Sequence, residues 1–166
     1  MAQIARPNST IDNGGWTVIG APTHHEAVDD EIKDDDASYV KCVEGNTMLK
    51  LALSALEEPR ERIGHHARIW AMAFGSGKGE SVDGYLYQGT TLIGQMFSNR
   101  TIFRVPYELY SGSVLESEVL LITDYSDLQL HFEYSSIGAG EQIRITMAEF
   151  EVPNPLTYKG PVMMII

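Results

Sequence analysis

Residues 128–152 read LQLHFEYSSIGAGEQIRITMAEFEV, two alternating segments separated by the loop IGAGE at 137–141. A period of two residues, apolar then polar, is typical of a β-strand with one buried face. In the second segment the apolar side changes midway, from Ile143 and Ile145 to Phe150 and Val152. This change predicts either a β-bulge or a change in what covers the strand.

Further strand patterns precede this stretch. YVKCV at 39–43 and TMLKLALS at 47–54 alternate in the same way. HARIWAMAF at 66–74 is largely apolar on both sides beyond Arg68, which indicates a central strand covered on both faces. VDGYLYQGTTLIGQMF at 82–97 predicts a hairpin whose tight turn contains Gly89.

About seven or eight short strands with almost no helical period indicate an all-β fold. We predict an antiparallel β-sandwich of jelly-roll type. We divide the chain into an irregular N-terminal segment with one short strand at 1–38, a β-sandwich domain at 39–153 and a C-terminal tail at 154–166. Residues 111–122 fit either a short helical turn or a plain connection, and Pro106 indicates a bulge or an edge strand.

Composition excludes several functions. The chain has 166 residues with 12 basic and 23 acidic side chains, a net charge of −11, and lacks the basic cluster that nucleic-acid binding requires. Its apolar runs fall short of the ~18 residues that would indicate a membrane-spanning helix. We also expect no signal peptide and no membrane partner. Cys42 is the only cysteine, and its strand-like context predicts a buried apolar filler.

The stretch TDYSDL at 123–128 could be a turn or a small ion or catalytic cluster. Asp124, Tyr125 and Asp127 lie just before an alternating strand. Asp and Ser readily bond their own backbone in tight turns, whereas calcium or carboxylate catalysis would need further ligands or acids from elsewhere. We predict a structural turn, with Tyr125 packed inward.

Two other groups of polar residues resemble ion sites. The acidic run at 29–36, with Asp34, Asp35 and Asp36 as the candidate ion loop, lacks EF-hand spacing and fits a solvated surface better. The histidine doublets at 24–25 and 65–66 offer at most one zinc ligand each if they lie on strands. GSGKGES at 75–81 lacks the P-loop spacing, and no hydrolase motif occurs. We expect no catalysis, no metal and no cofactor.

Aromatic residues raise a second possibility. Sugar-binding sandwiches stack sugar rings on exposed aromatic side chains, and Tyr85 and Tyr87 share one strand face. The alternative, that the aromatic residues belong to the core or an interface, is favoured over sugar binding. The residues considered are Trp16, Trp70, Tyr85, Tyr87, Tyr107 and Tyr110.

Several motifs together resemble a β-sandwich domain of tailed-phage virion proteins. The most specific are TDYSDL at 123–128 and AEFEVP at 148–153. They are accompanied by RPNSTI at 6–11, the strand HHARIWAM at 65–72, which starts at histidine, and the QGTT hairpin at 88–91. Such domains are similar to galactose-binding-type jelly rolls, and small proteins of this kind resemble head decoration (cement) proteins.

The resemblance implies a structural protein on the outer capsid surface of a virion. It would stabilise contacts of the major capsid protein and form a homo-oligomer, with a trimer favoured over a dimer. The apolar end of the chain would then serve as an interface on a neighbouring subunit, formed by Val162, Met163, Met164, Ile165 and Ile166. The alternatives are a carbohydrate-binding module of a phage tail or adhesin and, with less support, a jelly-roll hydrolase.

Overall fold

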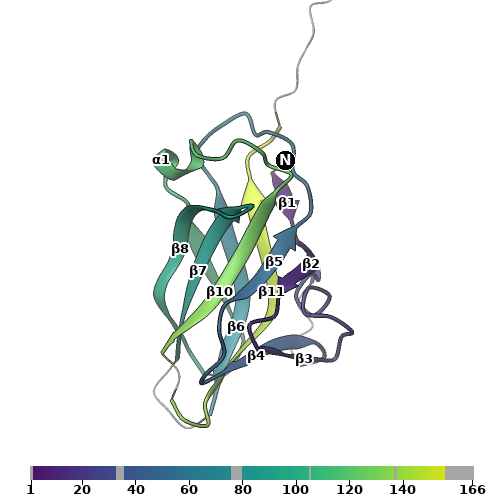
Figure 1. Cartoon of the computed structure of the whole chain (residues 1–166), viewed down its shortest axis with the longest axis vertical. Helices are drawn as coiled ribbons and strands as arrows, with labels where there is room; N and C mark the ends of the chain where they lie inside the picture. The colour runs from purple at the N-terminus through teal and green to yellow at the C-terminus, as the bar shows by residue number, and fades with distance from the viewer. Residues whose placement is uncertain (1, 33–35, 76–79, 105, 137, 156–166) are drawn as a thin grey trace, which may run out of the picture.

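The computed structural model describes residues 2–32, 36–75, 80–104, 106–136 and 138–155, and these form eleven strands and one short helix (Figure 1). In chain order they are β1 (Gln3–Ala5), β2 (Pro7–Asp12), β3 (Thr17–Ile19), β4 (Tyr39–Val43), β5 (Leu49–Leu53), β6 (His66–Phe74), β7 (Glu80–Gln88), β8 (Thr91–Ile102), β9 (Glu108–Ser113), α1 (Glu116–Val119), β10 (Leu128–Ser136) and β11 (Gln142–Val152).

The strands build two antiparallel sheets that pack face to face. One sheet has the order β3-β4-β11-β6-β9, with β1 added alongside β11. The other has the order β2-β5-β10-β7-β8 and faces the viewer in Figure 1. This arrangement confirms the predicted antiparallel sandwich of jelly-roll type. The core lies between the two sheets.

The N-terminal segment differs from its prediction, because the described residues among 1–38 supply three strands instead of one. β1 pairs with β11, β2 with β5 and β3 with β4. Edge strands with one poorly covered face need no apolar alternation, and PNSTID in β2 has none. Their pairing is imposed by the partner strands, so local pattern alone does not reveal it.

The two alternating segments at 128–152 become β10 and β11, which occupy the middle of opposite sheets. Their inward side chains, such as Phe132 and Phe150, are fully buried. In β11 the pairing with β6 shifts between Ile145 and Met147, which is the bulge that the change of apolar side predicts. Beyond the bulge the backbone N–H of Ala148 donates to the carbonyl of Val28 at 2.8 Å. The loop that contains Val28 therefore bonds to the part of β11 that lies between its pairing with β4 and its pairing with β1.

Local predictions also hold at the hairpin and the connection. β7 and β8 form the predicted hairpin, with Gly89 at φ 54° in its turn. The 111–122 connection contains α1, and β9, which follows Pro106, lies at the edge of its sheet.

In the described part of the chain, no helix is long and apolar enough to cross a membrane. Residues 162–166, the predicted interface, lie outside the described residues.

Candidate functional site

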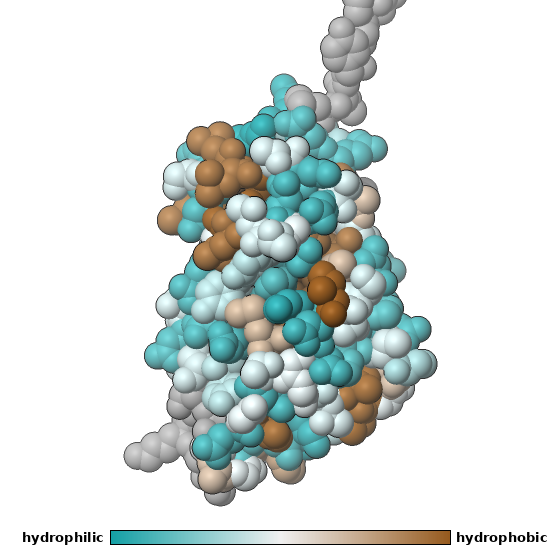
Figure 2. All heavy atoms as spheres, in the orientation of Figure 1, coloured by the Kyte–Doolittle hydropathy of each residue, from teal (hydrophilic) through white to brown (hydrophobic). Residues whose placement is uncertain are grey.

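The outer face of the five-stranded sheet carries polar and aromatic side chains in register. Leu128, Leu130 and Phe132 of β10 point into the core, so the residues between them point outward. One row of paired residues crosses all five strands, and its members are Gln95 (β8), Tyr85 (β7), His131 (β10), Lys50 (β5) and Asp12 (β2). Figure 2 views this side of the molecule, which is largely hydrophilic, with an apolar patch at the end that carries α1 and smaller apolar spots elsewhere.

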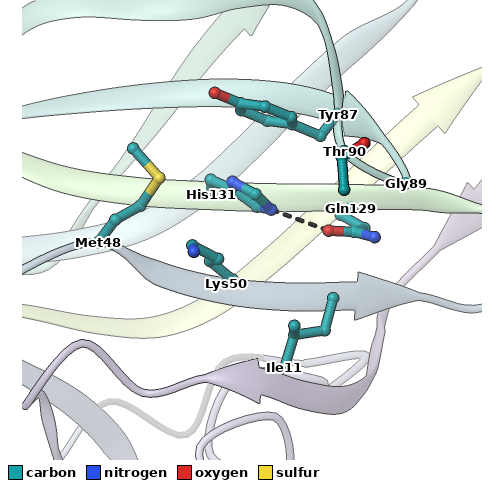
Figure 3. Close-up of a pocket in the computed structure, with 8 residues that line it drawn as sticks. All are labelled: Ile11, Met48, Lys50, Tyr87, Gly89, Thr90, Gln129 and His131. Carbon is teal, nitrogen blue, oxygen red and sulfur yellow. Dashed lines mark hydrogen bonds between the residues drawn. The ribbon is translucent and has the colours of Figure 1, made fainter.

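A groove of about 410 Å³ lies on this face. Strands β2, β5, β7 and β10 and the β7–β8 turn contribute its walls, and Figure 3 shows their side chains. The lining residues are Ile11, Met48, Lys50, Tyr87, Gly89, Thr90, Gln129 and His131. Apolar surface with a few polar groups is the usual composition of a small-molecule site.

An aromatic pair forms part of the groove wall. The rings of Tyr87 and His131 stack with centroids 4.1 Å apart and an interplanar angle of 17°. The Nε2 of His131 lies 2.9 Å from Oε1 of Gln129 (Figure 3). Because Oε1 can only accept, Nε2 carries the proton and donates, and the amide N–H groups of Gln129 are left for other partners.

His131 is uncharged at neutral pH. Its side chain is buried beneath its neighbours, and burial together with the nearby Lys50 ammonium lowers its pKa to about 4. The imidazole therefore packs as a neutral ring against Tyr87 and donates a hydrogen bond to Gln129, and Lys50 is the one cation among the described lining residues.

Lys50 has one acidic neighbour at the rim. Its Nζ lies 3.5 Å from Oδ2 of Asp12, and both side chains are partly exposed. The Oδ1 of Asp12 accepts the backbone N–H of Gly14 at 3.1 Å. That bond, and then the charge of Lys50, lower the pKa of Asp12 below its ordinary value.

Most of these groups were not singled out by the sequence analysis. The alternation of LQLHFEY places Gln129 and His131 on the polar face of their strand, and that of TMLKLAL does the same for Lys50. Only the pairing order of the strands brings them beside Tyr87, and that order depends on contacts between residues distant in the sequence. Tyr85 and Tyr87 were predicted to share a face, and both are partly exposed on it.

The predicted TDYSDL turn forms an Asx turn. Oδ1 of Asp124 accepts both the backbone N–H of Ser126 at 2.8 Å and its hydroxyl at 2.6 Å. Tyr125 is buried, and its hydroxyl lies 2.9 Å from Nε2 of His65. The backbone carbonyl of Asp127 accepts the N–H of Gly89 at 3.1 Å. These contacts give the Asp124 carboxylate and the Tyr125 hydroxyl structural partners, while the Asp127 carboxylate is exposed.

The same turn is joined to the QGTT hairpin. Oε1 of Gln88 accepts the backbone N–H groups of Thr123 and Asp124 at 2.8 and 3.0 Å. The Nε2 of Gln88 donates to the hydroxyl of Thr123 at 2.9 Å. Two motifs that lie 35 residues apart in sequence therefore form one unit at the end of the groove.

The other candidate ion sites are not assembled in the described residues, which contain no cluster of three or more His, Cys, Asp or Glu side chains placed to hold a metal. Asp34 and Asp35 lie outside the described residues. Asp36 accepts from Arg144 Nη1 at 3.1 Å and from the Tyr107 hydroxyl at 3.3 Å. Its partners are thus protein side chains.

The histidine doublets are separated by their hydrogen bonds. His24 Nε2 donates to the carbonyl of Trp16 at 2.8 Å, and His25 Nδ1 lies near the hydroxyls of two threonines. His65 faces Tyr125, while His66 Nδ1 lies 2.9 Å from the hydroxyl of Ser113. Each imidazole is oriented by a different neighbour.

The remaining aromatic and thiol candidates are mostly buried. Trp16, Tyr107 and Tyr110 belong to the buried residues, and the indole N–H of Trp16 donates to the carbonyl of Thr47 at 2.8 Å. Cys42 is fully buried in the core, and burial raises its pKa to about 12. A thiol in that environment stays protonated and unreactive.

Fold and groove together define a β-sandwich with a polar, aromatic groove on one sheet. No family model and no curated protein match the chain. Among solved structures, it is similar to the CBM22-1 xylan-binding domain of Xyn10C from Paenibacillus barcinonensis, with a TM-score of 0.52, 11% identity and coverage of 92% of this chain and 96% of that one.

A weaker likeness joins the chain to CBM29-2, solved as a mutant in complex with mannohexaose. The TM-score is 0.43 at 14% identity, with 93% of this chain and 94% of that chain covered. At these identities the likeness to CBM22-1 shows a shared β-sandwich fold alone. Nothing in these comparisons shows a virion or decoration protein.

Proposed function

We propose that this chain is a carbohydrate-binding protein and that the groove on the five-stranded sheet is its glycan site. The observation that carries the proposal is the Tyr87–His131 stack beside the polar groups of Lys50 and Gln129. A sugar ring has apolar C–H faces and hydroxyl edges, so it needs aromatic surface next to hydrogen-bonding groups. The sandwich shared with a xylan-binding domain supports the same function.

The site binds without cleaving. A glycosidase uses a pair of carboxylic acids flanking the scissile bond. Among the described residues that line the groove, none is Asp or Glu. Asp12 stands at the rim and already holds Gly14 and Lys50.

A glycan array followed by calorimetry tests this function. We expect the wild-type chain to bind at least one class of glycan and Tyr87→Ala to weaken that binding roughly ten-fold or more, because the aromatic surface is lost. Tyr39→Ala is the matched control, since Tyr39 lies on the opposite sheet against the guanidinium of Arg144. Failure to bind any glycan, or equal binding by Tyr87→Ala, would contradict the proposal.

The second candidate function is decoration of a phage capsid. It is favoured by an apolar patch on and around α1, in addition to the resemblance carried by TDYSDL and AEFEVP (Figure 2). Three leucines that flank α1 are between 55% and 65% exposed, namely Leu115, Leu120 and Leu121. Exposed apolar area of this kind usually contacts another protein. The partner would be the major capsid protein, bound by a homo-oligomeric, preferably trimeric, form of this chain.

Glycan binding and capsid decoration predict different copy numbers in phage particles and different effects of the same substitutions. Quantitative mass spectrometry of purified particles would show copy numbers comparable to those of the capsid subunit if the chain decorates a capsid. Leu120→Asp would then reduce capsid binding, whereas Tyr87→Ala would not. Absence of the chain from particles would rule out decoration and leave glycan binding untouched.

A further inference from the structure

The groove offers hydrogen-bond donors in preference to acceptors. Lys50 Nζ supplies an ammonium, and the amide N–H groups of Gln129 have no protein acceptor within the described part of the chain. The orientation of this amide is fixed by His131, which donates to its carbonyl oxygen. No Asp or Glu is among the described lining residues, so Lys50 is the one charged side chain there, with Asp12 paired to it at the rim, although the chain carries a net charge of −11.

A carboxylate of the protein itself, that of Asp12, already contacts the Lys50 ammonium. Oδ2 of Asp12 approaches Nζ of Lys50 at 3.5 Å, with 52% of the Asp12 side chain and 36% of the Lys50 side chain exposed. An exposed ion pair of this kind contributes little to stability. A ligand can therefore displace Asp12 from the ammonium at small cost.

We infer that the groove is selective for sugars that carry a carboxylate, such as uronic or sialic acid residues, and that Lys50 and Gln129 bind this group beside the Tyr87–His131 stack. The inference rests on the proposed glycan-binding function and names its ligand class. An ammonium and an amide donor suit a carboxylate, and charge-assisted hydrogen bonds are about twice as strong as neutral ones. A neutral sugar could use the same donors only more weakly.

The overall negative charge does not oppose this inference at physiological salt. Interactions between exposed charges are largely screened beyond a Debye length of about 8 Å at 0.15 M salt. The nearest charges therefore determine what binds at the groove. Affinity for an acidic sugar should accordingly fall as the salt concentration rises from about 0.05 M to about 0.5 M, because the Lys50 contact is partly exposed.

The test compares a galacturonic acid tetramer with its methyl ester, which has the same sugar rings without the charge. Calorimetry on the full chain should show tighter binding of the acid, by roughly ten-fold. Lys50→Met keeps the length of the side chain and removes the ammonium, and it should abolish this preference. Lys50→Arg retains the positive charge and should restore most of it.

Asp12→Asn gives an independent test with the opposite sign. The substitution removes the competing charge, and its amide oxygen can still accept the N–H of Gly14, so the turn is kept. We expect Asp12→Asn to bind the acid several-fold more tightly and the ester about as before.

Two outcomes separate this inference from the function on which it rests. Equal binding of acid and ester, with Lys50→Met behaving like wild type, would overturn the inference and leave glycan binding intact. A carboxylate preference unaffected by both Lys50→Met and Asp12→Asn would also overturn it, because another part of the surface would then be responsible. If neither tetramer binds, no other acidic sugar binds and the glycan array is negative, the proposed function itself fails.

Discussion

The rings of Tyr87 and His131 lie stacked across two neighbouring strands, with their centroids 4.1 Å apart. Tyr87 pairs in register with Gln129, two residues before His131 on β10. The hydrogen bond from His131 to Gln129 closes this group of three side chains. The stack fixes the tyrosine ring, and the hydrogen bond orients the Gln129 amide that lines the groove.

His131→Phe should separate these two roles. Phenylalanine preserves an aromatic partner for Tyr87 but cannot donate to Gln129, so the fold should keep its stability within ~1 kcal/mol while ligand affinity falls several-fold. His131→Ala should cost about 2–3 kcal/mol by removing the packed ring. Urea unfolding and calorimetry on both variants measure the two effects. Unchanged glycan binding by His131→Phe would show that the amide orientation is unimportant.

Acid should destabilise the protein between pH 6.5 and pH 4. Burial lowers the pKa of both His65 and His131 to about 4, from an ordinary value of 6.5. Below pH 6.5 the unfolded chain takes up protons on these groups and the folded chain does not, so stability falls until about pH 4, where the folded histidines protonate as well. The loss is roughly 3 kcal/mol for each histidine at its largest.

Urea unfolding at a series of pH values measures this loss. His131→Phe removes one of the two groups and should give a distinctly shallower decline over the same range. If the wild type and His131→Phe lose stability in parallel between pH 6.5 and pH 4, His131 is not buried in its neutral form.

Sequence alone was sufficient for the architecture where local pattern and tertiary contact agree. Alternation at 128–152 predicted both central strands, and the change of apolar side in β11 predicted its bulge. Gly89 in QGTT predicted the hairpin. In each case the side chains that set the pattern are the ones that the fold buries or bends.

The rest depended on pairing between distant segments. β1 and β2 lack a buried alternating face of their own, so only β11 and β5 reveal them as strands. The groove needs Lys50, Tyr87 and His131 side by side, which requires the order β5-β10-β7. A single sequence specifies each strand's polar face but not which polar faces become neighbours.

The buried hydroxyl of Tyr125 should stabilise the TDYSDL turn. It lies 2.9 Å from His65 Nε2 and accepts from Arg62 Nη1 at 3.5 Å. Tyr125→Phe leaves the imidazole nitrogen buried without this partner, and we expect a loss of about 1–3 kcal/mol in the free energy of unfolding. Tyr134→Phe is a suitable comparison because its hydroxyl accepts only the exposed N–H of Gly45, at 3.1 Å. Equal losses in the two variants would show that burial of the Tyr125 hydroxyl is unimportant.

Gly89 links the hairpin to both the turn and the groove, so substituting it should affect stability and binding together. Its φ of 54° lies in the left-handed region, where alanine is strained by roughly 1 kcal/mol and asparagine by less. A Cβ at this position would come within 3.0 Å of Oδ2 of Asp127, an exposed carboxylate that can move aside.

We therefore expect Gly89→Ala to lower the free energy of unfolding by about 1 kcal/mol and Gly89→Asn by about half as much. Because Gly89 and Thr90 line the groove, Gly89→Ala should also weaken glycan binding at a temperature where the variant is fully folded. Thermal unfolding and calorimetry on the same samples measure both quantities. If Gly89→Asn lowers the free energy of unfolding more than Gly89→Ala does, the prediction is wrong. The contact of the new side chain with Asp127 then outweighs the backbone strain at this position.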